Sequence, residues 1–287
     1  MLKATITGTH RHNLLVPDPG LRLFREFDGD GNVVFEMKTP GLSYDAWKLP
    51  DGTYLYAYIS PDSLHGVAHV RADGSEITHY KTEAQIFSCQ PLEDGAFLVG
   101  ELHTMQLVEV AKDGKVRKII PIQSVKSCHN TMRMCRKCPD GTYLVNQPED
   151  KVIRRYDGDG IILSEIKTPG DTFDVVWDGK GGIYYTAQKE IFLVREADGT
   201  VLRHITEEDL APINPCWLTG MELLEDGSLI VTNWLGHGMA GKGAPIFEVA
   251  PDGSVPWTLK APEFTDCMAN VQSLDEDAAA IIRGIRR

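Results

Sequence analysis

Histidine is the residue type whose distribution most suggests chemistry in this 287-residue chain. An imidazole can act as a base, a nucleophile or a metal ligand because its pKa lies near neutrality. Six of the nine histidines fall in short polar segments between apolar, strand-like stretches. They are His10, His12, His65, His103, His129 and His237. Whether they can act together depends on the fold that positions these segments.

A repeated turn motif predicts that fold. Asp-Gly pairs recur in "LPDGTYLYAY", "LEDGAFLVGE", "CPDGTYLVNQ" and "LEDGSLIVTN", and a second series such as "VRADGSEITHY" and "READGTVLRHI" alternates with them. Each pair sits between short runs rich in Val, Ile, Leu and Tyr, which is the pattern of a tight β-hairpin. Glycine supplies the positive φ that such a turn needs. Two hairpins per repeat give four antiparallel strands.

Four-stranded units that recur about every 40 to 45 residues fit the blades of a β-propeller. We predict one all-β domain over residues 1–287, a six-bladed β-propeller of four-stranded antiparallel blades, with seven blades as the alternative. Five blades follow one another along the chain, and both termini together close the last one. The segments "KATITGT" and "AAAIIRG" both fit the second strand of that closing blade.

This architecture converts sequence position into location. The first strand of a blade crosses the disc and the second returns, so the loop before the first and the loop after the second share one face. His129 and Asn130 precede a first strand in the third blade, and His65, His103 and His237 follow second strands. We expect His12, with His10, in the equivalent loop of the sixth blade. The sequence therefore predicts a histidine-lined channel mouth.

Other polar and aromatic residues are expected at the same mouth. Trp217 and Trp234 suit a sugar or an aromatic ring, because indole has a flat apolar face and a polar edge. Packing between blades is the alternative for both. Asp45 and Asp174 occupy matching positions in two blades, as an acid and base pair or as acceptors of backbone hydrogen bonds, and we favour the second. Tyr44 and Gln147 complete the predicted substrate-binding set.

Three cysteines form a second pattern. Cys128, Cys216 and Cys267 stand at the start of first strands, where three thiols facing the axis could bind a soft metal. Cysteine is also a small and usually buried residue, so packing in the crowded inner ring is the interpretation we favour. Because strand side chains alternate, Cys128 and His129 should point in opposite directions, with His129 facing the channel. The remaining C-x-x-C pair, Cys135 and Cys138, has no second pair nearby and is not a zinc ribbon.

Composition excludes several classes of function. The formal net charge is -12 and there is no basic stripe, which argues against nucleic acid and anionic membranes as partners. No run of eighteen apolar residues occurs, and the start "MLKATITGTHRHN" lacks the apolar core of a signal peptide, so we predict a cytoplasmic protein. "GHGMAGKG" resembles a phosphate loop but lacks its Ser or Thr, so no nucleotide cofactor is expected. The oligomeric state is left open.

Two stretches carry a family resemblance. "CHNTMRMCRKCPDGTYLV" and "NWLGHGMAGKGAPIFEVAPDGSVPW" resemble bacterial six-bladed propellers of the quinoprotein-like and arylsulfotransferase-like group, and the chain is also similar to bacterial propeller lyases. The first resemblance implies that His129 is a catalytic nucleophile. The second implies that histidines of several blades hold a divalent metal. The tryptophan-docking repeats of quinone-binding relatives are absent, which argues against a quinone cofactor.

These observations predict an enzyme that binds a small, polar, carbohydrate-like substrate at the histidine-lined mouth. We favour elimination or hydrolysis, with His129, His103 and His237 as catalytic residues. His129 would be the base or a metal ligand, and His103 and His237 would be partner ligands or an acid. Three imidazoles could hold a divalent metal ion that acidifies a proton or activates water. One alternative is group transfer through a covalent His129 intermediate, without metal. The other is a non-enzymatic ligand-binding or interaction propeller.

Overall fold

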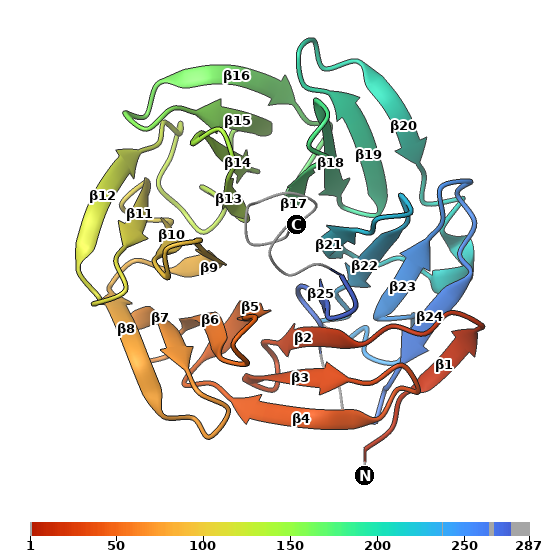
Figure 1. Cartoon of the computed structure of the whole chain (residues 1–287). Coiled ribbons are helices and arrows are strands. Elements are labelled where there is room, and N and C mark those ends of the chain that lie inside the picture. The colour runs from red at the N-terminus through yellow and green to blue at the C-terminus, as the bar shows by residue number, and fades with distance from the viewer. Residues whose placement is uncertain (1, 237, 264–266, 277–287) are drawn as a thin grey trace.

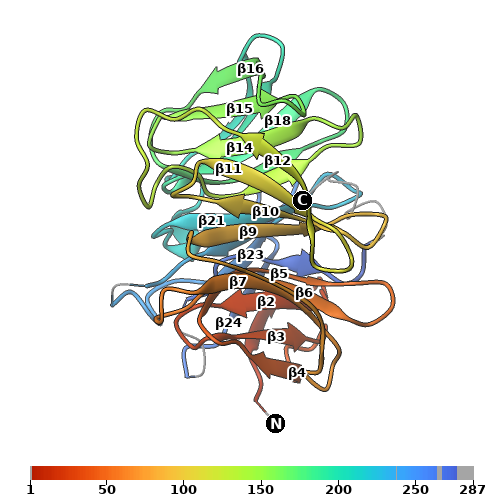
Figure 2. The same ribbon diagram turned by 90° about the vertical axis from the view of Figure 1, so that its left-hand side faces the viewer.

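The chain forms a ring of six β-sheets around a central axis (Figure 1). The structure is a computed structural model that describes residues 2–236, 238–263 and 267–276. Seen from its edge, the ring has loops projecting on both sides (Figure 2). The six-bladed all-β propeller is therefore confirmed, and the seven-bladed alternative is wrong. In the described residues the single helix is the 3-10 turn Ala211–Ile213, so none of the described helices is of a length that could cross a membrane.

Blades one to five run from the axis outward in chain order, four strands to a blade. Blades one and two consist of β5 (Leu42–Lys48), β6 (Tyr54–Ile59), β7 (His65–Val70) and β8 (Glu76–Thr82), then β9 (Ile86–Pro91), β10 (Phe97–Glu101), β11 (Gln106–Val110) and β12 (Val116–Pro121). Blades three and four consist of β13 (Cys135–Lys137), β14 (Tyr143–Gln147), β15 (Val152–Tyr156) and β16 (Ile162–Lys167), then β17 (Thr172–Trp177), β18 (Gly182–Ala187), β19 (Glu190–Arg195) and β20 (Val201–Ile205). Blade five contains, from the axis outward, β21 (Leu218–Leu223), β22 (Leu229–Asn233), β23 (Ile246–Val249) and β24 (Trp257–Lys260), and a fifth strand from the N-terminal part of the chain pairs with β24.

The Asp-Gly turns do what the sequence predicts. Gly52, in the turn between β5 and β6, has φ +80°, and its counterpart Gly95 has φ +78°. The aspartate before the glycine closes the turn, because Asp51 Oδ1 accepts a hydrogen bond of 3.0 Å from the Thr53 N–H. All these hairpins lie on one side of the ring, which we call the hairpin face. The opposite side, where the innermost strands begin, is the mouth face.

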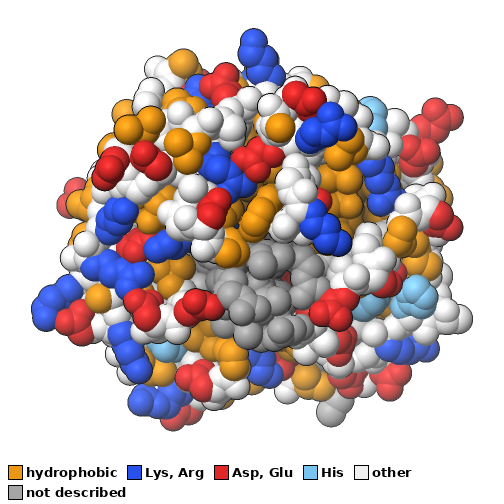
Figure 3. Space-filling view, turned by 45° about the horizontal axis from the view of Figure 1, so that its top comes forward, with side chains coloured by type: hydrophobic (Ala, Val, Ile, Leu, Met, Phe, Trp, Pro, Cys, Tyr) orange, Lys and Arg blue, Asp and Glu red, His pale blue; other side chains and the backbone are white. Residues whose placement is uncertain are grey.

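The middle strands of each blade are apolar on both sides because every blade packs between two others. β6 and β10 are buried at every position. The outer strands β12 and β4 (Val33–Lys38) consist mainly of partly or fully exposed residues. On the side of the molecule shown in Figure 3, acidic and basic side chains are interspersed rather than separated by sign. The buried layers between blades therefore hold the ring together, and polar chemistry is confined to the two faces and the axis.

The closing blade differs from the prediction in one strand. Its order from the axis is β25 (Gln272–Ser273), β2 (Leu14–Asp18), β3 (Leu23–Phe27) and β4, so both termini do contribute. The second strand is β2, however, and not "KATITGT", which forms β1 (Thr5–Gly8) as a fifth, outermost strand on blade five. β2 is buried throughout while β1 is largely exposed, which suits their inner and outer places. The other candidate, "AAAIIRG", lies outside the described residues.

Candidate functional site

A cavity of about 390 Å³ opens on the mouth face, over the starts of the innermost strands. Its walls combine aromatic rings with a few polar and charged groups. They are Tyr44, Phe87, His129, Asn130, Arg133, Pro148, Asp171, Thr172, Phe173, Trp217, Thr219 and Trp234. The cavity brings together five of the side chains predicted for the site, namely Tyr44, His129, Asn130, Trp217 and Trp234. A concave site lined by apolar rings with a few convergent polar groups is the usual form of a small-molecule site.

One structural position in five consecutive blades supplies much of this wall. In each of these blades one residue donates the backbone N–H hydrogen bond that closes the first hairpin, for example Leu49 in blade one and Cys138 in blade three. The position in question lies five residues before that donor. The side chains at this position are Tyr44, Phe87, Arg133, Phe173 and Thr219. Aligning the repeats on their Asp-Gly turns would have found Arg133, Phe87 and Phe173, which sequence reasoning based on residue type missed.

A β-bulge recurs at the same position. In blade four the pairing of β17 with β18 shifts between Thr172 and Val175, and in blade five that of β21 with β22 shifts between Leu218 and Met221. Blades one and two have the same shift. A bulge inserts an extra residue, bends the strand and redirects a side chain, and bulges are frequent beside functional sites. The backbone irregularity is therefore part of how the cavity wall is built.

His129 lies in a turn and not at the start of a strand, because β13 begins only at Cys135. Thr131 fixes this turn: its Oγ1 accepts a 2.7 Å hydrogen bond from the Cys128 N–H and donates to the carbonyl of Lys126. Strand alternation thus does not apply to residues 128 and 129. They nevertheless diverge, since His129 lines the cavity and the Cys128 thiol contacts Glu149 at 3.3 Å.

The imidazole of His129 is set up as an unprotonated base. Its Nδ1 lies 3.0 Å from Gln85 Oε1, an atom that only accepts, so Nδ1 carries the proton and Nε2 keeps its lone pair. Loss of solvation in the cavity wall, and then the charge of Arg133, lower the pKa of His129 to about 4. The ring stands edge-on to Phe87 at 5.0 Å. His129 is therefore neutral throughout the physiological pH range.

Arg133 is the cation of the cavity. Its guanidinium lies over the ring of Phe87 at 4.2 Å and near that of Phe173 at 5.8 Å. It donates to the His129 carbonyl at 2.8 Å and to the side-chain oxygen of Asn130. Burial lowers the pKa of Arg133 to about 10, against the opposing charges of Tyr44 and Asp171, so it stays charged at neutral pH. These contacts hold the positive charge beside the His129 ring.

Two indoles form the opposite wall. Trp217 precedes β21, Trp234 follows β22, and the backbone N–H of Trp234 donates to the backbone carbonyl of Trp217 at 2.8 Å. Gly236 makes room for the second indole, because a Cβ at that position would meet Trp234 Cζ2 at 2.1 Å. The aromatic rings therefore offer flat faces on two sides of the cavity.

The carboxylates predicted for the site lie deeper. Asp45 and Asp174 are completely buried in the channel. Asp174 accepts hydrogen bonds from the N–H groups of Val175 at 2.8 Å and of Met221, in the next blade, at 2.7 Å. Asp45 accepts from the Cys89 N–H at 3.2 Å. They serve as acceptors of backbone hydrogen bonds between blades, as favoured above, and not as cavity groups.

Gln147 also forms hydrogen bonds within the protein interior. It is fully buried, donates to the Gln123 carbonyl at 2.7 Å and accepts from the Tyr156 hydroxyl at 2.7 Å. Both hydrogen-bonding ends of the amide thus connect the second strand of blade three to its third strand and to the preceding loop. Gln147 does not line the cavity.

Three of the remaining histidines lie apart from the cavity. His65 begins β7 on the mouth face, where it is buried and its Nδ1 accepts from the Ser60 N–H at 3.0 Å. His103 is exposed in the loop between β10 and β11. The placement of His12 was wrong. It precedes the second strand of its blade instead of following it, so it lies on the hairpin face, beside Glu248. His237 lies outside the described residues.

The sequence predicted two possible metal sites, one formed by histidines and one by cysteines, and the structure bears on them differently. A site of His103, His129 and His237 requires a residue outside the described part. Within residues 2–236, 238–263 and 267–276, the one group of three ligating side chains close enough to share an ion is His10, His12 and Glu248, away from the cavity. Cys128, Cys216 and Cys267 form no such group among the described residues; Cys267 is buried, whereas Cys128 and Cys216 are half-buried.

Comparison with known proteins finds solved structures that share the fold of this chain. The chain matches no protein-family model and no curated protein sequence. A protein of unknown function from Bacteroides caccae superposes with a TM-score of 0.81 at 20% identity, over 91% of this chain and 98% of that one. A streptogramin B lyase superposes with a TM-score of 0.61 at 12% identity, over 89% and 87% of the two chains. This chain shares the fold of streptogramin B lyases.

The likeness recurs in further lyase structures. Virginiamycin B lyase from Staphylococcus aureus superposes with a TM-score of 0.58 at 13% identity, over 90% of this chain and 88% of that one. A catalytically inactive variant of that enzyme with quinupristin gives 0.59 at 11% identity, over 91% and 90% of the two chains. At such identities the likeness establishes the architecture alone, a six-bladed propeller.

Proposed function

We propose that this protein is a lyase that eliminates a group from a small, polar, carbohydrate-like substrate bound in the mouth cavity, with His129 as the base. The observation that carries the proposal is the juxtaposition of a neutral imidazole, with its Nε2 lone pair available, and the half-buried charge of Arg133 in one aromatic-lined cavity. The lyase-like fold supports the same reaction class. Trp217 and Trp234 would stack on the ring of the substrate.

The proposed step is a proton abstraction beside a carbonyl or carboxylate. His129 Nε2 takes the proton from carbon, the C–H electrons form a carbon–carbon double bond, and the neighbouring C–O bond breaks. The leaving oxygen then receives a proton from the imidazolium. Arg133 stabilises the negative charge that develops on the carbonyl or carboxylate oxygen. An anionic substrate would also raise the pKa of His129 and make it a stronger base in the complex.

Hydrolysis is the related alternative, in which the same Nε2 would take a proton from water. A divalent ion held by His103, His129 and His237 would supply polarisation of the carbonyl, and no step above depends on it. The six free cysteines suit a reducing compartment, so we place the protein in the cytoplasm.

The test is a screen followed by paired variants. Purified protein is incubated with uronate oligosaccharides and a streptogramin B antibiotic, and formation of a double bond is followed by ultraviolet absorbance and mass spectrometry. On any substrate turned over, His129→Ala should lower kcat/KM by about 10² to 10⁴, the usual contribution of a general base. Arg133→Gln should lower it as well, with both variants remaining folded by circular dichroism.

His103→Ala is the matched control, because His103 lies on the same face but outside the cavity. Its activity should be unchanged if His129 acts alone as the base. A loss in both histidine variants, reversed by added metal, would favour the metal form of the proposal. Full activity of His129→Ala on every substrate would refute the site, and a covalent adduct on His129 in the intact mass would favour group transfer.

A further inference from the structure

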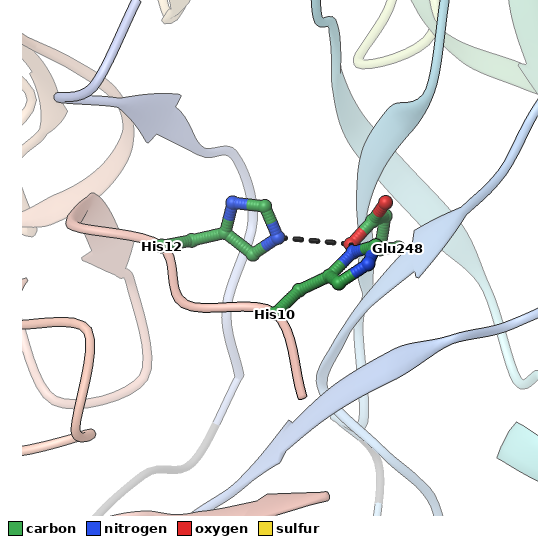
Figure 4. A group of neighbouring side chains, drawn as sticks. All are labelled: His10, His12 and Glu248. Carbon is green, nitrogen blue, oxygen red and sulfur yellow. Dashed lines mark hydrogen bonds and ion pairs between the residues drawn. The ribbon is translucent and has the colours of Figure 1, made fainter. Parts of the chain in front are cut away.

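The hairpin face carries a second cluster of reactive side chains. The linker between β1 and β2 brings His10 and His12 against Glu248 of β23 (Figure 4). His10 Nδ1 and His12 Nε2 lie 2.8 and 2.9 Å from the same carboxylate oxygen, Oε2 of Glu248. The two histidines are more than 230 residues from Glu248 in the chain, so the cluster exists only in the folded ring.

The spacing of these atoms is already close to that of a metal site. The three ligand atoms all lie within 4.8 Å of one another. Zinc binds imidazole nitrogen and carboxylate oxygen at about 2.0–2.2 Å, so two ligands of one tetrahedral ion stand about 3.3–3.5 Å apart. The observed nitrogen-to-oxygen distances of 2.8 and 2.9 Å therefore need to open by about half an ångström for an ion to replace the two hydrogen bonds.

The residues around the cluster hold it in place. The His12 ring stands edge-on to Trp257 at 4.9 Å, and Trp257 is the strand partner of Glu248. The next residue, Asn13, is anchored by Asp275, whose carboxylate accepts from the Asn13 N–H at 2.7 Å. His12 and Glu248 have side chains only 11% and 2% exposed, while that of His10 is 47% exposed. Two ligands are thus fixed by packing, and the third faces solvent.

The electrostatics of the cluster suit a cation. Glu248 supplies a carboxylate whose side chain is only 2% exposed. Each imidazole can turn a lone pair toward an ion beside that carboxylate by carrying its proton on the other ring nitrogen. Two imidazoles and one carboxylate, with an open position toward solvent, are a typical ligand set for Zn²⁺ and neighbouring transition ions.

We propose that His10, His12 and Glu248 bind one divalent transition-metal ion, for which Zn²⁺ is the best fit, with water in the remaining coordination position. The site is independent of the mouth cavity. It fastens the linker between β1 and β2 to blade five, at the point where the chain passes from blade five to blade six. The ion thereby acts on the closure of the ring, and its expected effect is on stability rather than on turnover.

The test uses the full chain after chelator treatment and dialysis. Zn²⁺ titrated by calorimetry should bind at one ion per chain and raise the midpoint of thermal unfolding, because a ligand that binds only the folded state stabilises it. Co²⁺ should give visible d–d absorption from the same site. Glu248→Gln, which keeps the shape of the side chain, and His12→Ala should each weaken Zn²⁺ binding at least about 100-fold, since each removes one of three ligands.

The chain offers a matched control in His204→Ala. His204 Nε2 and Glu190 Oε2 form a similar pair at 3.0 Å on blade four, and it belongs to no group of three ligands among the described residues. This variant should bind Zn²⁺ like the parent protein. Equal affinity in Glu248→Gln, His12→Ala and the parent, or no binding at micromolar Zn²⁺, would overturn the proposal and leave a hydrogen-bonded cluster. If His12→Ala does not fold, Glu248→Gln and the Co²⁺ spectrum of the parent still decide.

Discussion

Arg133 and Arg136 lie three residues apart in blade three, yet they belong to two different regions, the mouth cavity and the channel interior. Arg136 is fully buried and pairs with Asp45 at 3.2 Å. Burial alone would lower the pKa of Arg136, but the charges of Asp45 and Asp174 outweigh it and raise the pKa. In Arg133 burial prevails and lowers the pKa to about 10. The charge of Arg136 is therefore balanced by buried carboxylates, whereas the charge of Arg133 is available to a ligand in the mouth cavity.

The same contrast extends to the strand positions around them. Polar side chains one residue further along the innermost strands than the cavity wall form hydrogen bonds in the interior. Asp45, for example, accepts from Asn270 Nδ2 at 3.2 Å, and Ser88 Oγ accepts from Arg136, a residue deeper in blade three, at 2.9 Å. Polar groups in the interior are therefore used for joining blades, whereas those at the ends of the strands remain available. A polar residue on an innermost strand is therefore a candidate functional residue only where it lies beside the β-bulge, near the start of the strand at the mouth face.

The largest expected effect is on the interior cation. Arg136→Met should lower the free energy of unfolding by about 3–5 kcal/mol, because it leaves the charge of Asp45 buried without its partner. Urea denaturation followed by fluorescence measures the change. Lys115→Met is the control, since Lys115 pairs with Asp113 on the surface and its loss should cause no measurable change. Equal stability of Arg136→Met and the parent would contradict the distinction between the regions.

A smaller effect is expected from the acidity of the interior. Burial raises the pKa of Asp174 to about 6, against the attraction of Arg136. Between about pH 4 and 6 the folded protein keeps a proton that the unfolded chain has released, so the contribution of this group to stability falls as the pH rises and is constant above 6. The fall should amount to at most about 3 kcal/mol, since each pKa unit corresponds to about 1.4 kcal/mol.

Unfolding free energies measured across this pH range would show it. Asp174→Asn should remove the fall, whatever its effect on stability at a single pH, because asparagine does not titrate. The comparison rests on the slopes, since the substitution also alters the hydrogen bond to Met221. The same pH slope in the variant and the parent would mean that Asp174 titrates normally in the folded state.

The smallest change in stability is expected at the mouth. Arg133→Gln should cost about 1 kcal/mol or less, as is typical of positions that do not leave a partner charge buried. It should instead raise the pKa of His129 from about 4 toward its ordinary value, because the charge of Arg133 contributes to the lowered pKa. A ring-proton NMR titration of His129 measures the shift. A loss of stability as large as that of Arg136→Met would place Arg133 in the framework.

The sequence was sufficient to predict the blades, because each Asp-Gly turn is a local signal that needs no tertiary information. It was not sufficient for the closing blade. Two other segments, "KATITGT" and "AAAIIRG", were assigned to its second strand, whereas "LLVPD" is the buried strand β2. That one error also moved His12 to the wrong face, since a residue before a second strand lies at the hairpins. Five mouth residues were found from their type and their place in the repeat, namely Tyr44, His129, Asn130, Trp217 and Trp234.

Arg133, Phe87 and Phe173 could not be found by type, because arginine and phenylalanine are ordinary residues for a surface and a core. Only their shared position relative to the turns distinguishes them. Asp45 and Asp174 show the converse, since their type suggests catalysis while their burial and backbone partners assign them to the framework. Side-chain environment, which depends on all six blades, decides both cases.

The closing blade has a consequence for how the protein is made. Strands β2 to β4 leave the ribosome before the five other blades, but their inner partner β25, which pairs through Gln272 and Ser273, follows those blades in the chain. Until then the inner edge of β2 presents unpaired backbone groups and the apolar side chains of Leu14 and Leu15, the kind of edge that promotes association between chains. The nascent protein must therefore keep one apolar strand edge unpaired while the five other blades are synthesised. It should depend on chaperones that shield such an edge more than a propeller whose last blade is formed by consecutive strands.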